Sequence, residues 1–295
     1  MLVSPFFAGR PLPEGSRQFG RETAVEQIRG VLGDAPAENP LVICGPLSVG
    51  KTSLLHQLSS GVLGPDICVL YTDFDALETS SESLFLWQFA KSIMQAMEQQ
   101  EFDGPAIEKR MLILNPQLVF RQRFWNPLMT RAATTPLLLT WDNFDSLSST
   151  SKENRNTQVV RAYLYELLET QSPVDLIFTI TGRLEALAEN ALAPFQPKRS
   201  LRLANLGVEQ TIQLIRSSDQ LPVTTSVAEF IAYLTGGHPG DTQLICQKLF
   251  ERHVVRHHGQ VTVADVIAVL QIQLSPGDFV GDVYRRLGRT SSIGF

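Results

Sequence analysis

The chain has 295 residues, 43% of them hydrophobic, which is enough for one large domain and one small domain. Its formal net charge of -5 excludes a general electrostatic attraction to nucleic acid or anionic membranes and leaves open a local basic face. No uncharged stretch approaches the roughly 20 apolar residues of a spanning helix, and the first residues lack a signal-like segment, so we expect a cytoplasmic protein.

The first residues, 1–18, are rich in proline, glycine and arginine without periodicity, which indicates an extended arm lying on the following domain. Structure is predicted to begin at Phe19, before a helix with Val25, Ile28 and Leu32 on one face. The Phe19-Gly20 pair can pack against an adenine, but such a pair at a helix start is more often core and turn.

The stretch GPLSVGKTS lies between a buried apolar run, Leu41 to Cys44, and a helical pattern that begins at Lys51. Its two glycines allow a close backbone approach, so successive N–H groups can surround a phosphate at the start of a helix. Lys51 supplies a positive charge and Thr52 a hydroxyl for Mg²⁺. The pattern predicts a phosphate-binding loop made of Gly45, Pro46, Leu47, Ser48, Val49, Gly50, Lys51, Thr52 and Ser53.

Further apolar runs predict the other strands of the same sheet: Ile67–Tyr71, Pro136–Trp141, Asp175–Ile180 and Leu201–Leu203. Between them we expect helices over Ser83–Gln99, Gln117–Ala133 and Asn156–Glu169, whose aromatic and methionine residues form core. Alternating strands and helices predict an α/β fold with a parallel sheet and right-handed crossovers. The cysteines Cys44, Cys68 and Cys246 lie among aliphatic residues and are predicted to be buried hydrophobes without chemistry.

The third strand runs directly into Asp142-Asn143-Phe144-Asp145. A carboxylate at the end of the strand beside the phosphate loop can hold Mg²⁺, so we expect Asp142 and Thr52 to be the metal ligands. Arg183 follows the fourth strand, where strand ends surround a ligand, and can reach a γ-phosphate; a surface arginine is the plainer alternative.

From about Leu206 the pattern contains helices only, which predicts a small helical domain. The expected domains are the arm 1–18, a nucleotide-binding domain 19–205, a helical domain 206–274 and a tail 275–295. His253 and His257 stand four apart on a helix but have no third metal ligand, so a solvated helix end is expected. The predicted helices are Val208–Ser217, Ser226–Leu234, Pro239–His257 and Val263–Leu274.

The chain contains the segments FGRE at Phe19, GPLSVGKT, LLLTWDNFD ending at Asp145, FTITGR ending at Arg183 and TGGHP ending at Pro239. Together, these segments resemble the AAA+-related STAND ATPases over nearly the whole chain. The resemblance implies a P-loop NTPase domain with a three-layer parallel sheet, a helical lid, and ATP or ADP with Mg²⁺ as cofactors. It implies that Gly45 to Ser53 form the Walker A loop and that Asp142 is the Walker B residue. It also implies that Phe19, Gly20 and Arg21 border adenine and ribose. Arg183 would then be a sensor, and Pro239 would pack near adenine.

The chain departs from the family pattern after Asp142, where a carboxylate usually polarises the attacking water and Asn143 stands instead. Asp145 could substitute in part, so we predict slow or partner-dependent hydrolysis. For an arginine finger only the positions of Lys198 and Arg199 suggest candidates. The chain stops soon after the lid, without room for a complete winged helix or sensor repeats.

The favoured function is a nucleotide-operated switch in signalling: ADP holds the sheet domain and lid closed, and Mg-ATP favours an open form that self-associates or binds protein partners. One alternative is a DNA-handling ATPase of the initiator or transposition-helper type, with Arg285, Arg286 and Arg289 at the start of a winged helix. A second alternative is a nucleotide-binding scaffold without turnover, suggested by Asn143.

Overall fold

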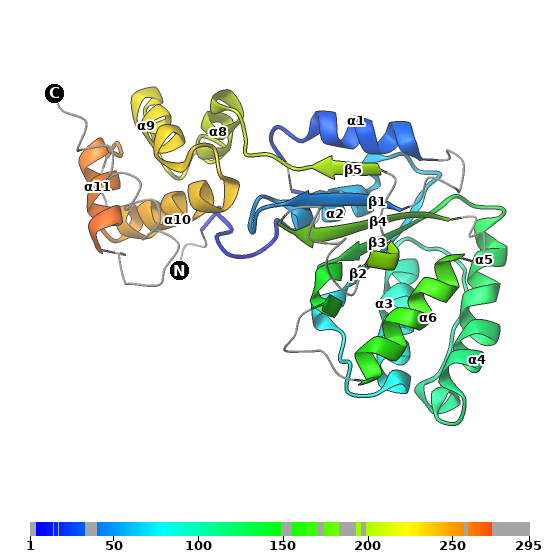
Figure 1. Cartoon of the computed structure of the whole chain (residues 1–295). Helices are drawn as coiled ribbons and strands as arrows, with labels where there is room; N and C mark the ends of the chain where they lie inside the picture. The colour runs from blue at the N-terminus through cyan, green and yellow to red at the C-terminus, as the bar shows by residue number, and fades with distance from the viewer. Residues whose placement is uncertain are drawn as a thin grey trace.

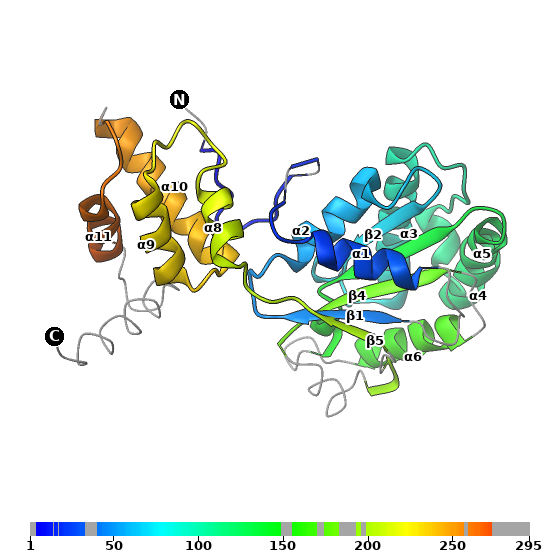
Figure 2. The ribbon, with the colours of Figure 1, turned by 90° about the horizontal axis from the view of Figure 1, so that it is seen from above.

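The computed structural model describes residues 4–13, 15–16, 18–32, 40–148, 155–169, 174–182, 193–195, 199–256 and 259–272. These residues form a larger part, with helices on both faces of a sheet, and a smaller part made of helices alone (Figure 1). Seen from above, the two parts lie side by side, and the first described residues run from one part to the other (Figure 2). Within the described residues, no helix is both long and apolar enough to cross a membrane.

The larger part is built on a five-stranded sheet in which every pair of neighbouring strands is parallel. The three inner strands are almost entirely buried because helices cover both faces of the sheet, and this explains their continuous aliphatic sequences. The edge strand Arg199–Arg202 instead alternates half-buried and exposed residues. The predicted α/β fold is confirmed, with small shifts at the strand ends. The strands are β1 (Leu41–Gly45), β2 (Cys68–Asp73), β3 (Leu137–Asp142), β4 (Asp175–Thr181) and β5 (Arg199–Arg202).

The strand order is β2-β3-β4-β1-β5, and this corrects one expectation. The strand that ends in Asp142, β3, does not lie beside β1, because β4 pairs with both of them. Chain order does not reveal this arrangement, since each crossover helix can return the chain to either side of the preceding strand. The carboxyl ends of β1, β3 and β4 still meet at one edge of the sheet.

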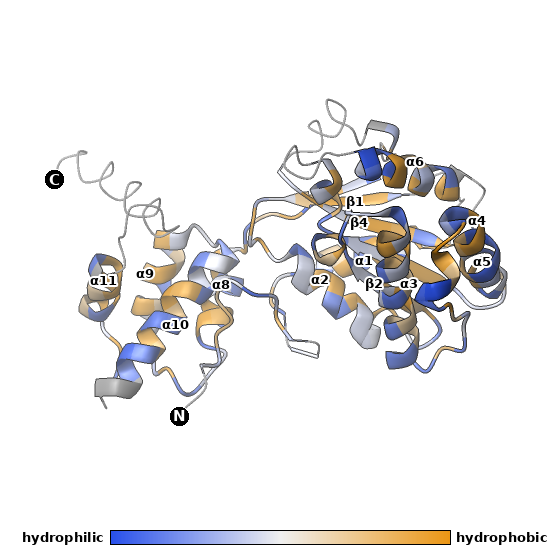
Figure 3. Ribbon diagram, turned by 90° about the horizontal axis from the view of Figure 1, so that it is seen from below, coloured by the Kyte–Doolittle hydropathy of each residue, from blue (hydrophilic) through white to orange (hydrophobic). Residues whose placement is uncertain are grey.

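Alternate side chains of the strands enter two separate cores: Val42 and Cys44 of β1 face one core, and Leu41 and Ile43 face the other. Figure 3 shows the hydrophobic colour concentrated on the strands and on helix faces that pack against them. One face is covered by α1 (Glu22–Val31) and α2 (Lys51–Gln57). The other is covered by α3 (Glu82–Gln99), α4 (Pro116–Phe120), α5 (Asn126–Ala132) and α6 (Arg155–Glu169).

The predicted helix Gln117–Ala133 is a continuous helical run in which a wider π turn, Arg121–Trp125, joins α4 to α5. Its aromatic residues belong to the larger core, as expected: Phe120 packs on Phe89 of α3, and Phe89 in turn packs on Trp141 of β3. A second π turn, Leu58–Val62, follows α2. The short 3-10 turns are Phe74–Ala76, Lys109–Leu112, Phe144–Ser148 and Ala193–Phe195.

The smaller part, here called the helical bundle, has a core of its own. Phe6 is 1% exposed and belongs to this core, so the first described residues attach to the bundle as well as to the sheet part that the sequence predicted. The sequence did not predict this contact, because one large apolar side chain in a run without periodicity does not indicate which core it joins. The bundle consists of α8 (Val208–Ile215), α9 (Thr225–Thr235), α10 (Pro239–Arg256) and α11 (Val263–Ile272).

All three cysteines are buried, as predicted, and they form no disulfide with one another. Burial raises the pKa of the Cys68 thiol to about 11 and that of Cys246 still further, so both thiols stay protonated at neutral pH. Of the histidine pair, His253 lies in α10 and His257 falls outside the described residues. The described part of the chain contains no cluster of His, Cys, Asp and Glu side chains with the arrangement of a metal site.

Candidate functional site

A cavity of about 220 Å³ lies at the carboxyl ends of the strands, between the sheet part and the bundle. It brings together Phe19 and Arg21, the loop from Leu47 to Ser53, Asn143 and Pro239 from the predicted set. Gly20, Gly45, Pro46, Asp142 and Asp145 are not among the residues that line it. The remaining walls are formed by Phe7, Gly9, Arg10, Pro11, Leu12, Gln18, Thr181, Leu206, Leu214, Gly240 and Gln243.

The loop between β1 and α2 has backbone features that suit the binding of an anion. Gly50 has a φ of 101°, a conformation that side chains disfavour, and it begins α2 without a side-chain cap. The free N–H groups and the dipole at this helix start create positive potential at the cavity. Leu47 points its side chain into solvent, 70% exposed, so the loop contributes mainly backbone to the site.

Lys51 is folded over the loop. Its Nζ donates hydrogen bonds to the carbonyl oxygens of Gly45, at 3.0 Å, and Pro46, at 2.9 Å, and the residue is 6% exposed. Burial lowers the pKa of this ammonium, while the nearby carboxylates of Asp145 and Asp142 act in the opposite direction. The charge therefore stands over the loop without a direct carboxylate partner among the described residues.

Arg21 connects the loop to the chain beyond β5. Its guanidinium donates to the carbonyl oxygens of Val49, at 2.7 Å, and Ala204, at 2.9 Å, and burial lowers its pKa. The segment expected to border adenine and ribose thus also fixes the shape of the loop. Phe19 also lines the cavity.

The start of α10 contacts the loop directly. The backbone N–H of Gly240 donates to the carbonyl of Ser48 at 3.2 Å, and Nε2 of His238 lies 3.0 Å from the carbonyl oxygen of Leu47. The other ring nitrogen of His238 lies 2.8 Å from Oδ1 of Asp241, and both residues are buried. Sequence reasoning identified Pro239 but missed its neighbours, because a lone His and Asp in a helix start carry no distinctive spacing.

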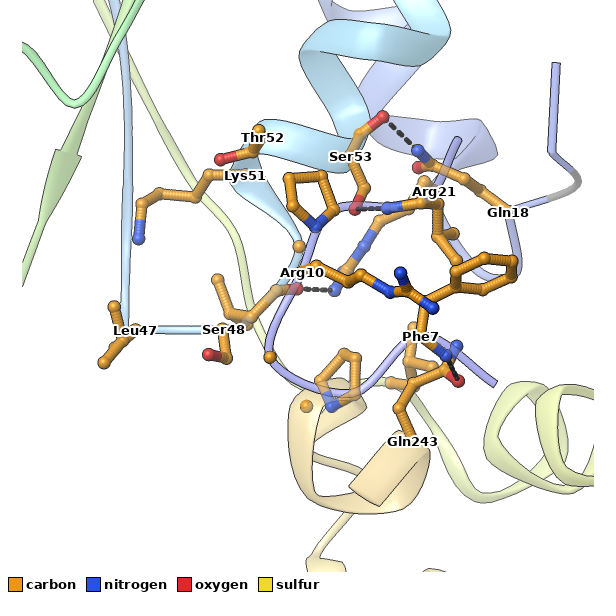
Figure 4. Close-up of a pocket in the computed structure, with 18 of the residues that line it drawn as sticks. Phe7, Arg10, Gln18, Arg21, Leu47, Ser48, Lys51, Thr52, Ser53 and Gln243 are labelled. Atoms are coloured by element: carbon orange, nitrogen blue, oxygen red, sulfur yellow. Dashed lines mark hydrogen bonds between the residues drawn. The ribbon is translucent and has the colours of Figure 1, made fainter. Parts of the chain in front are cut away.

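Residues of the arm form a wall that the sequence did not predict. Phe7 N donates to Oε1 of Gln243 on α10 at 3.1 Å, and Leu12 N donates to Oγ of Ser53 on α2 at 3.1 Å. Between them, the guanidinium of Arg10 lies 5.3 Å from the centre of the Phe7 ring. Figure 4 shows Phe7, Arg10, Ser53 and Gln243 around the loop. The arm therefore spans from the bundle to the helix that follows the predicted phosphate loop.

Asp142 is fully buried, and both of its carboxylate oxygens accept hydrogen bonds from hydroxyl groups. Thr179 of β4 donates to Oδ1 at 2.5 Å, and Tyr71 of β2 donates to Oδ2 at 3.1 Å. Burial, together with the neighbouring Asp142, raises the pKa of Tyr71 far above its ordinary value, so this hydroxyl is a donor at every ordinary pH. Neither partner was predicted, because they come from other strands.

Asn143 adopts a φ of 52°, and its backbone N–H donates to Oγ1 of Thr179 at 2.9 Å. Its side-chain Nδ2 donates to Oδ1 of Asp73, the last residue of β2, at 3.0 Å. Asp145 accepts a hydrogen bond from the N–H of Thr181 at 2.9 Å. Burial raises the pKa of Asp145, against the lowering effects of the Thr181 hydrogen bond and the Lys51 charge.

The sequence suggested Arg183 as a sensor at the γ-phosphate and Lys198 and Arg199 as candidates for an arginine finger. Arg183 and Lys198 fall outside the described residues. Arg199 pairs in register with Leu41 at the amino end of β1, so it lies at the edge of the sheet opposite the loop. At the end of β4, Thr181 lines the cavity and the N–H of Gly182 bonds to the carbonyl of Gly45 at 3.1 Å.

The available groups suit a magnesium nucleotide. Backbone N–H groups and Lys51 match phosphate oxygens, and the hydroxyl of Thr52 is an oxygen ligand of the kind that Mg²⁺ prefers. The carboxylate of Asp142 has the chemistry of a second ligand, but it is fully buried and does not line the cavity. The cavity is bounded by apolar side chains such as Phe7, Phe19 and Leu214, which suit the face of a base.

No protein-family model matches the sequence, and no curated protein matches it. Among solved structures, the chain is similar to a Walker-type ATPase of Pyrococcus abyssi, with a TM-score of 0.66 and 15% identity over 96% of this chain and 79% of that one. It is similar to the ORC2 protein of Aeropyrum pernix in its ADPNP–ADP complexes, with a TM-score of 0.61 and 12% identity over 93% and 72% of the two chains. For the ORC1 protein of that organism in complex with DNA, the TM-score is 0.55 at 13% identity, over 95% and 79%.

At these identities the likeness establishes the fold. The expected α/β fold, a parallel sheet followed by helices and shared with these solved structures, is confirmed. The assignment to the STAND group and the roles of the site residues stay predictions, and the chemistry has to be argued from the site.

Proposed function

We propose that this chain binds ATP and ADP with Mg²⁺, hydrolyses ATP slowly, and uses the nucleotide to switch its shape and its self-association in signalling. The cradle of the loop, the charge of Lys51 and the hydroxyl of Thr52 support nucleotide binding. Asp142, buried at the end of β3, supports a metal-dependent reaction at the terminal phosphate.

The observation that carries the switch is the direct contact between the loop and α10. The carbonyl groups of Leu47 and Ser48 are contacted by His238 and Gly240, so a change in loop conformation changes the docking of the bundle. A nucleotide moves such an equilibrium only by as much as its affinities for the two arrangements differ. ADP and ATP differ at the phosphate end, which is where this contact lies.

Slow hydrolysis follows from Asn143, because an amide does not accept the proton of the attacking water. Turnover of several ATP per second by the isolated chain would contradict this part of the proposal.

The switch is tested by light scattering of the purified chain after exchange into Mg-ADP and, separately, into a Mg-ATP analogue. We expect a larger mass or radius with the analogue and no such difference in Lys51→Ala, which lacks the phosphate contact. Equal affinity for the two nucleotides, together with an unchanged shape, would rule out the switch.

Gly240→Ala tests the loop contact itself. A Cβ at this position would lie 2.6 Å from Cβ of Ser48, so α10 has to move away from the loop. We expect a larger hydrodynamic radius with ADP than in the wild type, by light scattering or small-angle scattering. Gly259→Ala is the matched control, because a Cβ there meets no atom within 4 Å. An unchanged ADP-bound shape in Gly240→Ala would show that this contact does not hold the bundle closed.

A DNA-handling ATPase is the second candidate, favoured by the likeness to a protein solved in complex with DNA. The arginines predicted to contact phosphates, Arg285, Arg286 and Arg289, fall outside the described residues, and the net charge of -5 counts against the idea. Duplex binding that weakens steeply with salt in the presence of ATP would support it, and absence of such binding would remove it.

A nucleotide-binding scaffold without turnover is the third candidate. It is favoured by Asn143, whose amide is engaged with Asp73. Loss of function in Lys51→Ala with function retained in Asp142→Asn would favour this reading.

A further inference from the structure

Hydrolysis of ATP requires a group that takes the proton of the attacking water, and the inference here rests on the hydrolysis proposed above. Asn143, after Asp142, offers no basic site for that proton. The carboxylate of Asp142 accepts hydrogen bonds on both oxygens, from Tyr71 and Thr179. That of Asp145 holds the end of β4 through Thr181. The sequence suggested Asp145 as a substitute, but the structure offers another carboxylate.

Asp73 lies at the end of β2, in register with Asp142 of the neighbouring strand. Its Oδ1 accepts hydrogen bonds from Nδ2 of Asn143 and from the N–H of Asp75, both at 3.0 Å. No hydrogen bond from any described residue reaches its Oδ2. One oxygen therefore fixes the amide of Asn143, and the other can accept a hydrogen bond from water.

The contact also orients the amide. An ionised carboxylate only accepts hydrogen bonds, so the NH₂ group of Asn143 must face Asp73. The amide oxygen of Asn143 then remains as an acceptor, and no hydrogen bond from a described residue reaches it. The amide oxygen of Asn143 and Oδ2 of Asp73 are thus two acceptors on a hydrogen-bonded pair of side chains, and one water molecule can donate a hydrogen to each.

Asp73 and Asn143 stand at the boundary of two cavities. Asn143 lines the nucleotide cavity, whereas Asp73 lines a second cavity of about 510 Å³ along the open edge of β2, together with Tyr71 and Lys91. Figure 1 shows β2 as the edge strand beside β3. A proton accepted by Asp73 therefore has a polar route to solvent that does not pass through the nucleotide cavity.

We propose that Asp73 and Asn143 together replace the carboxylate that the position after Asp142 lacks. Asn143 accepts one hydrogen of the attacking water and Asp73 accepts the other. As the water oxygen bonds to the γ-phosphorus, the bond from that phosphorus to the bridging oxygen breaks, and its electron pair leaves with ADP. Asp73 takes the proton released by the water and passes it to solvent through the second cavity.

The variant Asp73→Asn separates a chemical role from a structural one. Its amide oxygen can still accept the bonds from Asn143 and Asp75, but it cannot take a proton. We expect kcat to fall by about 100-fold or more, within the range of general-base contributions, with the affinity for labelled ADP unchanged. If Asp73 only shaped the loop, this variant would keep the wild-type rate. Asp75→Asn, with the same loss of charge two residues away, is the matched control and should turn over as the wild type does.

A swap of the two side chains gives a second readout that needs no nucleotide. Asn143→Asp alone brings two carboxylates within hydrogen-bond distance, so its urea midpoint should fall below that of the wild type. Combining it with Asp73→Asn restores one amide and one carboxylate in the reverse order. We expect the double variant to recover the midpoint and most of the turnover that Asp73→Asn loses.

The possible outcomes distinguish a failure of this inference from a failure of the proposed function. Wild-type turnover in Asp73→Asn overturns the inference and leaves the ATPase intact, and loss of turnover in Asp145→Asn alone would then identify Asp145 as the base. Nucleotide binding without any turnover in the wild type overturns the inference and favours the scaffold. Failure of the wild type to bind labelled ADP or ATP removes the proposed function itself.

Discussion

Two regions at the same edge of the sheet are built in opposite ways. The predicted phosphate loop is one contiguous segment, and Lys51 bonds to a carbonyl only six residues away. The cluster at the strand ends is assembled from β2, β3 and β4, and its hydrogen bonds join residues as distant in sequence as Tyr71 and Asp142, 71 positions apart, or Asn143 and Asp73, 70 apart. The first region depends on local backbone geometry, whereas the second depends on the strand order.

The variant Lys51→Ala tests the loop and should have the largest effect. We expect nucleotide affinity to fall by about 100-fold or more, because charged hydrogen bonds contribute roughly 1.5–3 kcal/mol each and this ammonium is suited to make two with phosphate oxygens. Fluorescence titration with labelled ADP measures the loss, and circular dichroism checks that the fold is kept. Lys91→Ala, an exposed lysine on α3, is the control. Tight ADP binding by Lys51→Ala would show that the loop backbone suffices.

Tyr71→Phe tests the strand-end cluster and should have an intermediate effect. It removes one hydroxyl donor from a fully buried carboxylate, so the free energy of unfolding should fall by about 2 kcal/mol. Urea denaturation without nucleotide measures it. Tyr233→Phe is the control: this tyrosine is 72% exposed, so its substitution should leave the free energy of unfolding unchanged. Equal stability of Tyr71→Phe and the wild type would mean that the β2–β3 contact does not hold Asp142.

Asp145→Asn should have the smallest effect, visible in the pH dependence of stability. Burial raises the pKa of Asp145 in the folded chain above its unfolded value, so the folded chain holds this proton more tightly. The contribution of this group to stability therefore falls as pH rises from the ordinary aspartate pKa through the raised one. In Asp145→Asn, the free energy of unfolding from urea titrations should therefore fall less steeply as pH rises across this acidic range. Asp66→Asn, at an exposed aspartate, controls for charge, and an unchanged slope in Asp145→Asn would contradict the assignment.

The same contrast explains how far the sequence could predict the molecule. The loop was predictable because its spacing encodes its geometry within nine residues, Gly45 to Ser53. Strands and helices were predictable from periodicity, including the bundle helices. The position of β4 between β1 and β3 was not, since crossovers leave the spatial order open. Asp73, Tyr71 and Thr179 were missed for that reason, because only the strand order brings them to Asp142 and Asn143.

The anchors of the arm have a consequence for any opening of the molecule. Phe6 is held in the bundle core and Leu12 on α2, in addition to the covalent connection through Leu206. A bundle that leaves the loop therefore remains tethered, at an effective concentration on the order of millimolar for short linkers. Closure is then a property of each single chain and independent of dilution, whereas any assembly of several chains must weaken as the protein is diluted.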